Sequence, residues 1–182
     1  ETTGRLMPGV GVEYRMPLMG ELGGWGTQIV EPIVQVVART NETRIGRLPN
    51  EDAQSLIFDD TNLFDWNKFS GYDRIEGGVR ANYGLQYSVL GRNGFYANAL
   101  FGQSYQLGGR NSYSPGDIAN VGRDSGLETR ASDYVGRLTI NPSSSLTFST
   151  RARFDQDTFA LKRVESTLGA RIGMFSPSLT YA

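Results

Sequence analysis

The stretch RIEGGVRANYGLQYSV, residues Arg74–Val89, alternates in side-chain character from one position to the next. Its even positions hold charged residues, polar residues or glycine, whereas its odd positions carry no charge and include every large apolar side chain of the stretch. Successive side chains of a β-strand point to opposite faces, so the stretch predicts a strand with one polar and one apolar face. A helix would mix the two sets of side chains around its circumference.

The same alternation recurs along most of the chain and predicts about eight strands. It is blurred only in Gln28–Arg39, where Ile33 and Val37 fall on the more polar face. Several of these strands have about 10 to 16 residues, whereas soluble strands have about 5–6 and membrane-spanning strands about 9–11. Besides Arg74–Val89, the predicted strands are Gly9–Leu18, Gln28–Arg39, Phe95–Leu107, Tyr134–Ile140, Leu146–Phe154, Ala160–Ile172 and a last strand from near Ser176.

The connections between these strands differ in length in a regular way. The odd-numbered connections are all short and include a tight turn at Asn93-Gly94. Two of the three even-numbered connections, residues 40–73 and 108–133, are long. An up-and-down antiparallel barrel places odd and even connections on opposite rims, and outer-membrane barrels have short turns on one rim and long loops on the other. The sequence therefore predicts an all-β, antiparallel up-and-down transmembrane β-barrel.

The polar face of the predicted strands carries many charges. A packed core does not accept so many charged groups, but a water-filled barrel lumen does. An alternative stays open, in which a soluble sheet turns this face to bulk water. The side chains that we expect to line the lumen are Glu13, Arg15, Arg74, Glu76, Arg80, Arg137, Arg151, Arg153 and Arg171.

The composition excludes several classes of function. The 182 residues include 18 basic side chains, of which 16 are arginine, and 19 acidic ones, so the net charge is −1. This balance argues against general nucleic-acid binding, which needs a basic face. The chain has no cysteine and no histidine, which excludes disulfides, thiolate nucleophiles and histidine acid–base catalysis and disfavours a zinc or copper site. We therefore expect no enzyme activity, no catalytic residue, no cofactor and no resident metal.

Targeting signals are also missing from the sequence. No apolar run reaches the roughly 18 residues of a membrane-spanning helix. The first residues, ETTG at positions 1–4, have neither a basic start nor an apolar core. Because a secreted or membrane protein needs a signal peptide, the sequence predicts either a cytosolic protein or a fragment of a longer chain.

The first long connection, residues 40–73, contains the apolar spacing Leu63, Phe64, Trp66 and Phe69. This spacing predicts a short helix or a folded cap over the barrel, with Asp60 or Thr61 as a candidate N-cap.

Three aspartates of this connection, Asp59, Asp60 and Asp65, are candidate ligands of a divalent cation. The simpler interpretation, capping and solvated carboxylates, stays open because their spacing matches no calcium loop. In the second long connection, residues 108–133, arginines that could contact anionic sugars or phosphates alternate with acidic residues, so a solvated mixed-charge surface is the competing interpretation. These arginines are Arg110, Arg123 and Arg130.

Several stretches carry a resemblance to a known family. They are EPIVQ at 31–35, FDDTNLF at 58–64, FSGYDRIEGGVRANYG at 69–84, GQSY at 102–105 and SDYVG at 132–136. In this order they resemble the barrel domain of LptD, the lipopolysaccharide (LPS)-assembly outer-membrane protein family, also called organic solvent tolerance protein. The family's periplasmic jellyroll domain and its cysteines have no counterpart here, and the last residues, LTYA, do not resemble a terminal barrel strand.

The resemblance implies that residues 1–182 are an internal part of the barrel domain, with long loops at 40–73 and 108–133 and with eight strands that form part of a larger wall. It implies an outer-membrane location in a Gram-negative bacterium and delivery of LPS to the outer leaflet. The implied partners are LPS, outer-membrane lipid, a plug lipoprotein (LptE) inside the barrel and the periplasmic bridge components of the pathway. The alternatives are a passive porin-like channel and, from another class, a soluble β-sandwich binding module.

Overall fold

The chain forms one antiparallel sheet with almost no helix. The structure, a computed structural model, describes residues 5–42, 50–53, 55–114 and 121–182. The described helical segments are two single 3-10 turns, η1 (Gly23–Trp25) and η2 (Arg92–Gly94), and neither is long and apolar enough to cross a membrane. The strands are β1 (Gly9–Arg15), β2 (Leu18–Glu21), β3 (Gly26–Arg39), β4 (Gly78–Gly91), β5 (Tyr96–Gly108), β6 (Tyr134–Ser143), β7 (Leu146–Phe154), β8 (Leu161–Ala170) and β9 (Ser178–Tyr181).

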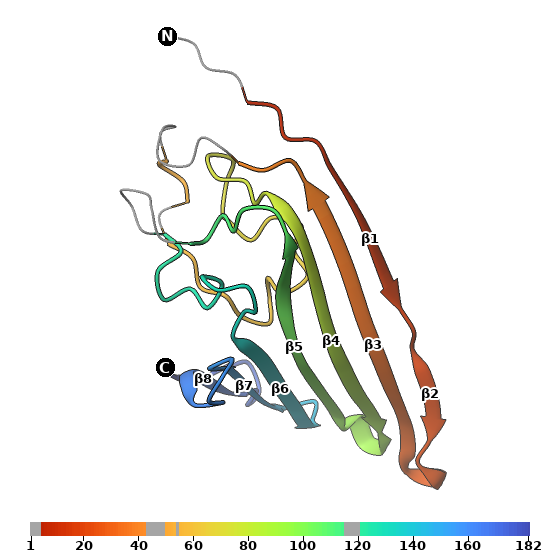
Figure 1. Cartoon of the computed structure of the whole chain (residues 1–182). Helices are drawn as coiled ribbons and strands as arrows, with labels where there is room; N and C mark the ends of the chain where they lie inside the picture. The colour runs from red at the N-terminus through yellow and green to blue at the C-terminus, as the bar shows by residue number, and fades with distance from the viewer. Residues whose placement is uncertain (1–4, 43–49, 54, 115–120) are drawn as a thin grey trace.

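The strands follow one another in space as they do in sequence. The order is β1-β3-β4-β5-β6-β7-β8-β9, with β2 also paired to β3, and every pairing is antiparallel. Strand β1 lies within the predicted strand Gly9–Leu18 and ends before Pro17, which has no N–H group for the ladder. Strand β2 shares only Leu18 with that prediction and otherwise lies in a stretch expected to be a short connection. The strand order confirms the up-and-down antiparallel prediction. The sheet is open within the described residues, as expected for part of a barrel wall, and it curves toward the side that holds the long connections (Figure 1).

The predicted tight turn between β4 and β5 is confirmed. Asn93 and Gly94 have φ values of 59° and 79°, which place both residues in the left-handed region. Asparagine and glycine adopt that region at the lowest cost, so this pair sets the register in which Leu90 lies opposite Tyr96.

The predicted start of the strand at Arg74 is wrong. The alternation starts at Arg74, but β4 starts at Gly78, so Arg74 and Glu76 belong to the preceding connection. Gly78 has a φ of 85°, and a Cβ there would lie 2.6 Å from the carbonyl oxygen of Gly108. A left-handed glycine ends the extended conformation, although the sequence on either side continues to alternate.

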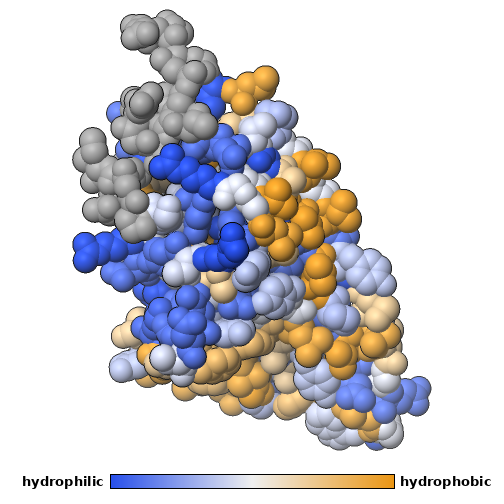
Figure 2. Space-filling view, viewed as in Figure 1, coloured by the Kyte–Doolittle hydropathy of each residue, from blue (hydrophilic) through white to orange (hydrophobic). Residues whose placement is uncertain are grey.

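Burial is reversed relative to a soluble sheet. Tyr83, Leu85 and Phe101 are 40%, 50% and 41% exposed. Arg80 and Asn82, on the opposite face of β4, are 2% and 1% exposed. Figure 2 shows apolar side chains gathered over the strands and hydrophilic ones over the connections.

The two long connections lie over the polar face of β3 to β5 and over part of that face on β6 to β8, and the described residues form no second sheet. We call the described residues between β3 and β4 the first connection and those between β5 and β6 the second connection. The apolar core lies in and beneath these connections, and only Val135 comes from a strand. Of the two predicted alternatives, a short helix or a folded cap, the helix does not form, because residues 60–64 form turns, and the connection folds onto the polar face instead. The predicted N-cap is wrong, because Asp59, not Asp60 or Thr61, accepts the capping bonds. The core residues are Ala53, Leu56, Phe58, Leu63, Phe69, Tyr113, Val121, Leu127 and Val135.

Candidate functional site

The polar face of β1 to β5 carries a ladder of hydrogen-bonded side chains. Gln35 donates to Glu13 over 2.7 Å and Asn82 donates to Gln35 over 2.7 Å. Ser104 donates to Asn82 over 2.5 Å, so the ladder crosses four neighbouring strands. These residues lie directly opposite one another in the register. Because each amide is satisfied by its neighbours, the ladder is a rigid polar surface on which the first connection rests.

The first connection docks on this surface through a notch made by two glycines. Gly84 and Gly102 lie opposite each other on β4 and β5. A Cβ at Gly102 would lie 2.6 Å from the Leu63 side chain, and one at Gly84 would lie 3.2 Å from the Phe64 ring. Gln35 also donates to the Phe64 carbonyl oxygen over 2.8 Å. The missing side chains thus make room for two apolar groups of the connection.

Four ionisable groups are buried where both connections meet β4. The Arg80 guanidinium forms an ion pair with Glu76 and lies 5.1 Å from the centre of the Tyr113 ring. Tyr113 donates to the other carboxylate oxygen of Glu76 over 2.8 Å, and burial raises its pKa well above the usual value. Lys68 donates to Asn82 over 3.2 Å, and burial lowers its pKa to about 8.

A second ladder, on β6 to β8, is built from charges. Arg137 lies directly opposite Arg151, and Arg153 lies directly opposite Arg163. Glu165 lies opposite Arg151 on β8. Like charges placed opposite each other repel, so this half of the polar face needs carboxylates from elsewhere.

The connections supply those carboxylates. Asp60, whose side chain is fully buried, lies 3.1 Å from Arg137 and 3.7 Å from Arg151. Asp59 lies 4.0 Å from Arg151, and Asp133 lies 3.4 Å from Arg153. Burial raises the pKa of Asp60, and the arginines only partly offset this effect.

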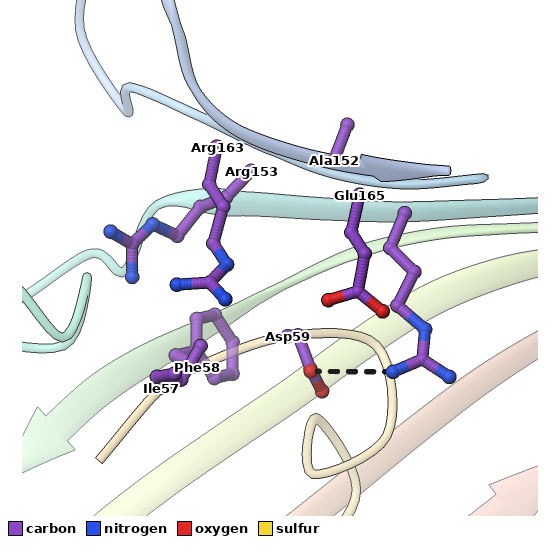
Figure 3. A pocket seen from close by; sticks show the side chains of 8 residues that line it. Ile57, Phe58, Asp59, Ala152, Arg153, Arg163 and Glu165 are labelled. Carbon is purple, nitrogen blue, oxygen red and sulfur yellow. Dashed lines mark ion pairs between the residues drawn. The ribbon is translucent and has the colours of Figure 1, made fainter. Parts of the chain in front are cut away.

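A small pocket separates the first connection from β7 and β8. Its volume is about 140 Å³, and Figure 3 shows its side chains converging from the connection and from the two strands. It is lined by Ile57, Phe58, Asp59, Arg151, Ala152, Arg153, Arg163 and Glu165.

The structure brings together some of the residues expected to line the lumen and separates others. Glu13 and Arg15 pair with each other over 2.6 Å on β1, and Arg80 pairs with Glu76. Arg137, Arg151 and Arg153 lie in the charged ladder described above. Arg74 is buried in the first connection, and Arg171 is exposed after the end of β8.

The possible cation site is not assembled. Asp59 and Asp60 face arginines while Asp65 is exposed, and no group of three metal-ligating side chains occurs in the described part of the chain. In the second connection Arg110, Arg123 and Arg130 are all exposed.

Two features add to the predicted site. The alternation of Ala160–Ile172 predicts that Arg163 and Glu165 lie on the polar face, but neither is among the side chains that we expect to line the lumen. The pairing of Asp60 with Arg137 joins residues 77 positions apart, and no local pattern signals such a contact.

One known family matches the chain. The model of the family described as "LptD: LPS transport system D" matches residues 1–182. The match therefore includes both ladders and both connections. No curated protein matches the chain.

Proposed function

Since the chain belongs to the LptD family of LPS transport proteins, we propose that it forms part of the wall of an outer-membrane barrel that delivers LPS to the outer leaflet. In this proposal the apolar face meets lipid and the polar face meets a wet lumen. Residues 1–182 would be part of the barrel domain of a Gram-negative outer-membrane protein.

The observation that carries the proposal is the reversed burial of the sheet. Large apolar side chains such as Leu85, Phe101 and Leu168 are exposed on strands from both halves. Monomeric soluble proteins rarely expose contiguous apolar patches larger than a few hundred Å². A lipid-facing barrel wall has this arrangement, with apolar residues outside and polar residues inside. The soluble β-sandwich is disfavoured, because the two long connections pack on the polar face and the described residues contain no second sheet.

The polar face suits the hydrophilic part of LPS. Phosphorylated sugars are strongly hydrated, so they need a path lined by hydrogen-bonding and charged groups. The amide ladder and the charged ladder supply such groups along neighbouring strands. We propose that the acyl chains move beside the apolar face, that the first connection covers part of the lumen, and that the plug lipoprotein LptE contacts the polar face.

Single-cysteine variants of the full-length protein test the orientation of the sheet. The 182 residues contain no cysteine, so once any cysteine elsewhere in the full-length protein has been replaced, a fluorophore at one introduced cysteine reports one position of this segment. In vesicles with brominated lipid, labels at Leu85 or Leu168 should be quenched, whereas labels at Gln86 or Thr167, on the opposite face, should not. Equal quenching at neighbouring positions would overturn the proposed orientation.

A delivery assay tests the transport role itself. Vesicles that contain the full-length protein and its plug lipoprotein should accept LPS in a protein-dependent manner. Steady ion conductance that does not change when LPS is added, together with no LPS delivery, would instead support the passive channel.

A further inference from the structure

We propose that Arg151 and Arg163 form a binding site for a phosphate group, and that the Asp59–Asp60 tip of the first connection is an internal anion that phosphate displaces from it. The phosphate group has two possible sources, a phosphorylated glycolipid and free phosphate. The glycolipid source rests on the proposed function, whereas the site itself does not.

The first argument is the register of β6, β7 and β8. Two pairs of arginines, Arg137 with Arg151 and Arg153 with Arg163, face each other across neighbouring strands. Arginines directly opposite each other destabilise a sheet unless anions lie between them. Four guanidinium groups on one face of three strands therefore make a place where an anion is stabilised.

The second argument is that the anions present do not satisfy all four arginines. Asp60 lies near Arg137 and Arg151, and Asp133 lies near Arg153. Arg163 makes no hydrogen bond or ion pair with any residue that the structure describes, and its guanidinium lines the pocket (Figure 3).

The third argument is the size and shape of the pocket. Its volume of about 140 Å³ is several times the roughly 30 Å³ of one water molecule, which is enough for a phosphate group. Ile57 and Phe58 form its apolar side, which weakens the competition from bulk water. Arginine binds phosphate through two parallel N–H donors, so it suits this ligand better than a point charge would.

The carboxylates of the pocket explain why displacement is part of the proposal. Asp59 lies 4.0 Å from Arg151, a long ion pair at a side chain that is 41% exposed. Glu165 lines the same pocket, so phosphate cannot enter beside both carboxylates without repulsion. Phosphate would take the place of Asp59 on Arg151 and add a polar contact to Arg163 that none of the described residues makes now.

Binding measurements on the full-length protein in detergent test this site, with titration calorimetry and inorganic phosphate as the first probe. Arg163→Gln should weaken phosphate binding about tenfold, the usual cost of one charged hydrogen bond. Asp59→Asn should strengthen it several-fold, because the internal competitor loses its charge. Arg92→Gln, an equal charge change in the exposed turn between β4 and β5, should leave binding unchanged.

The direction in which Asp59→Asn changes the phosphate affinity shows whether Asp59 competes with phosphate or helps to hold the site together. Weaker phosphate binding in Asp59→Asn, or unchanged binding in Arg163→Gln, would overturn the proposal. Arg163→Lys keeps the charge without the forked donors, so binding between that of the native protein and that of Arg163→Gln supports the site. Heat-modifiable mobility on gels confirms that each variant is folded.

The source of the phosphate follows from two further probes. If LPS competes with inorganic phosphate and LPS stripped of its phosphate groups does not, the site binds the glycolipid. If neither LPS sample competes, the site binds free phosphate, and the proposed transport function is unaffected. If the native protein delivered no LPS but still bound inorganic phosphate, the result would count against the proposed function and not against the site.

Discussion

The two halves of the sheet hold the first connection by different forces. On β3 to β5 the contacts are apolar packing into the glycine notch and amide hydrogen bonds, and the residues beneath are buried. On β6 to β8, apart from Val135 in the apolar core, the contacts are ion pairs with arginines that stay 30% and 41% exposed. Because ion pairs with partly exposed arginines contribute less than buried packing, the connection is anchored on the first half and only latched, that is, weakly held, on the second.

The buried ion pair beneath the anchored half should show the largest effect. Arg80→Met leaves Glu76 charged, buried and without its guanidinium partner, which should lower the free energy of unfolding by about 3–5 kcal/mol. Urea unfolding in detergent measures this. The double variant Glu76→Gln with Arg80→Met should be more stable than Arg80→Met alone. An equally unstable double variant would show that the loss comes from packing and not from charge.

The glycine notch gives the next largest effect. Gly102→Leu places a side chain where Leu63 now lies, and its Cβ would also lie 2.5 Å from the Tyr83 carbonyl oxygen. We expect a loss of about 2–3 kcal/mol and faster proteolysis within the first connection. The matched control is Gly169→Leu on β8, where a Cβ meets nothing closer than 3.9 Å. If both variants were cleaved at the same rate, the notch would not be the anchor.

The pH dependence of stability should report Lys68. Its pKa is lowered to about 8 in the folded chain from an unfolded value of 10.5, so the unfolded state binds more protons between these values. Stability should therefore rise by about 1–2 kcal/mol from pH 8 to pH 9.5. Lys68→Met should flatten this profile. Above pH 10 the effect ends, and Tyr113, whose pKa is raised, then lowers stability because the unfolded state releases its proton first.

The latched half should show the smallest effect on stability. Asp60→Asn removes the charge that faces Arg137 and Arg151, but burial already disfavours that charge, so we expect a loss below about 1 kcal/mol. The tip of the connection should nevertheless move away from β7, which distance measurements between spin labels on the two segments detect. Asp65→Asn, at an exposed position of the same connection, is the control. A large loss of stability in Asp60→Asn would remove the distinction between anchor and latch.

Much of the sheet follows from local sequence, and most of the site does not. The strands, their two faces and the Asn93-Gly94 turn depend on residues one or two positions apart, so the alternation reveals them. The start of β4 at Gly78 could not be predicted, because the alternation of side chains continues through this left-handed glycine. The short helix predicted over Leu63 and Phe69 is absent because those side chains pack into the sheet and the core instead. That the predicted charges line a lumen, and that the wall belongs to a larger barrel, stay predictions.

Alternation of period two, a property of each strand alone, establishes from sequence that this protein is a sheet with one apolar and one charged face. Which carboxylate meets which arginine depends instead on how the chain folds back over itself. Asp60 reaches Arg137 across 77 positions, and Leu63 finds its place only because Gly84 and Gly102 become neighbours. Such contacts arise from register and curvature, which side-chain periodicity does not encode.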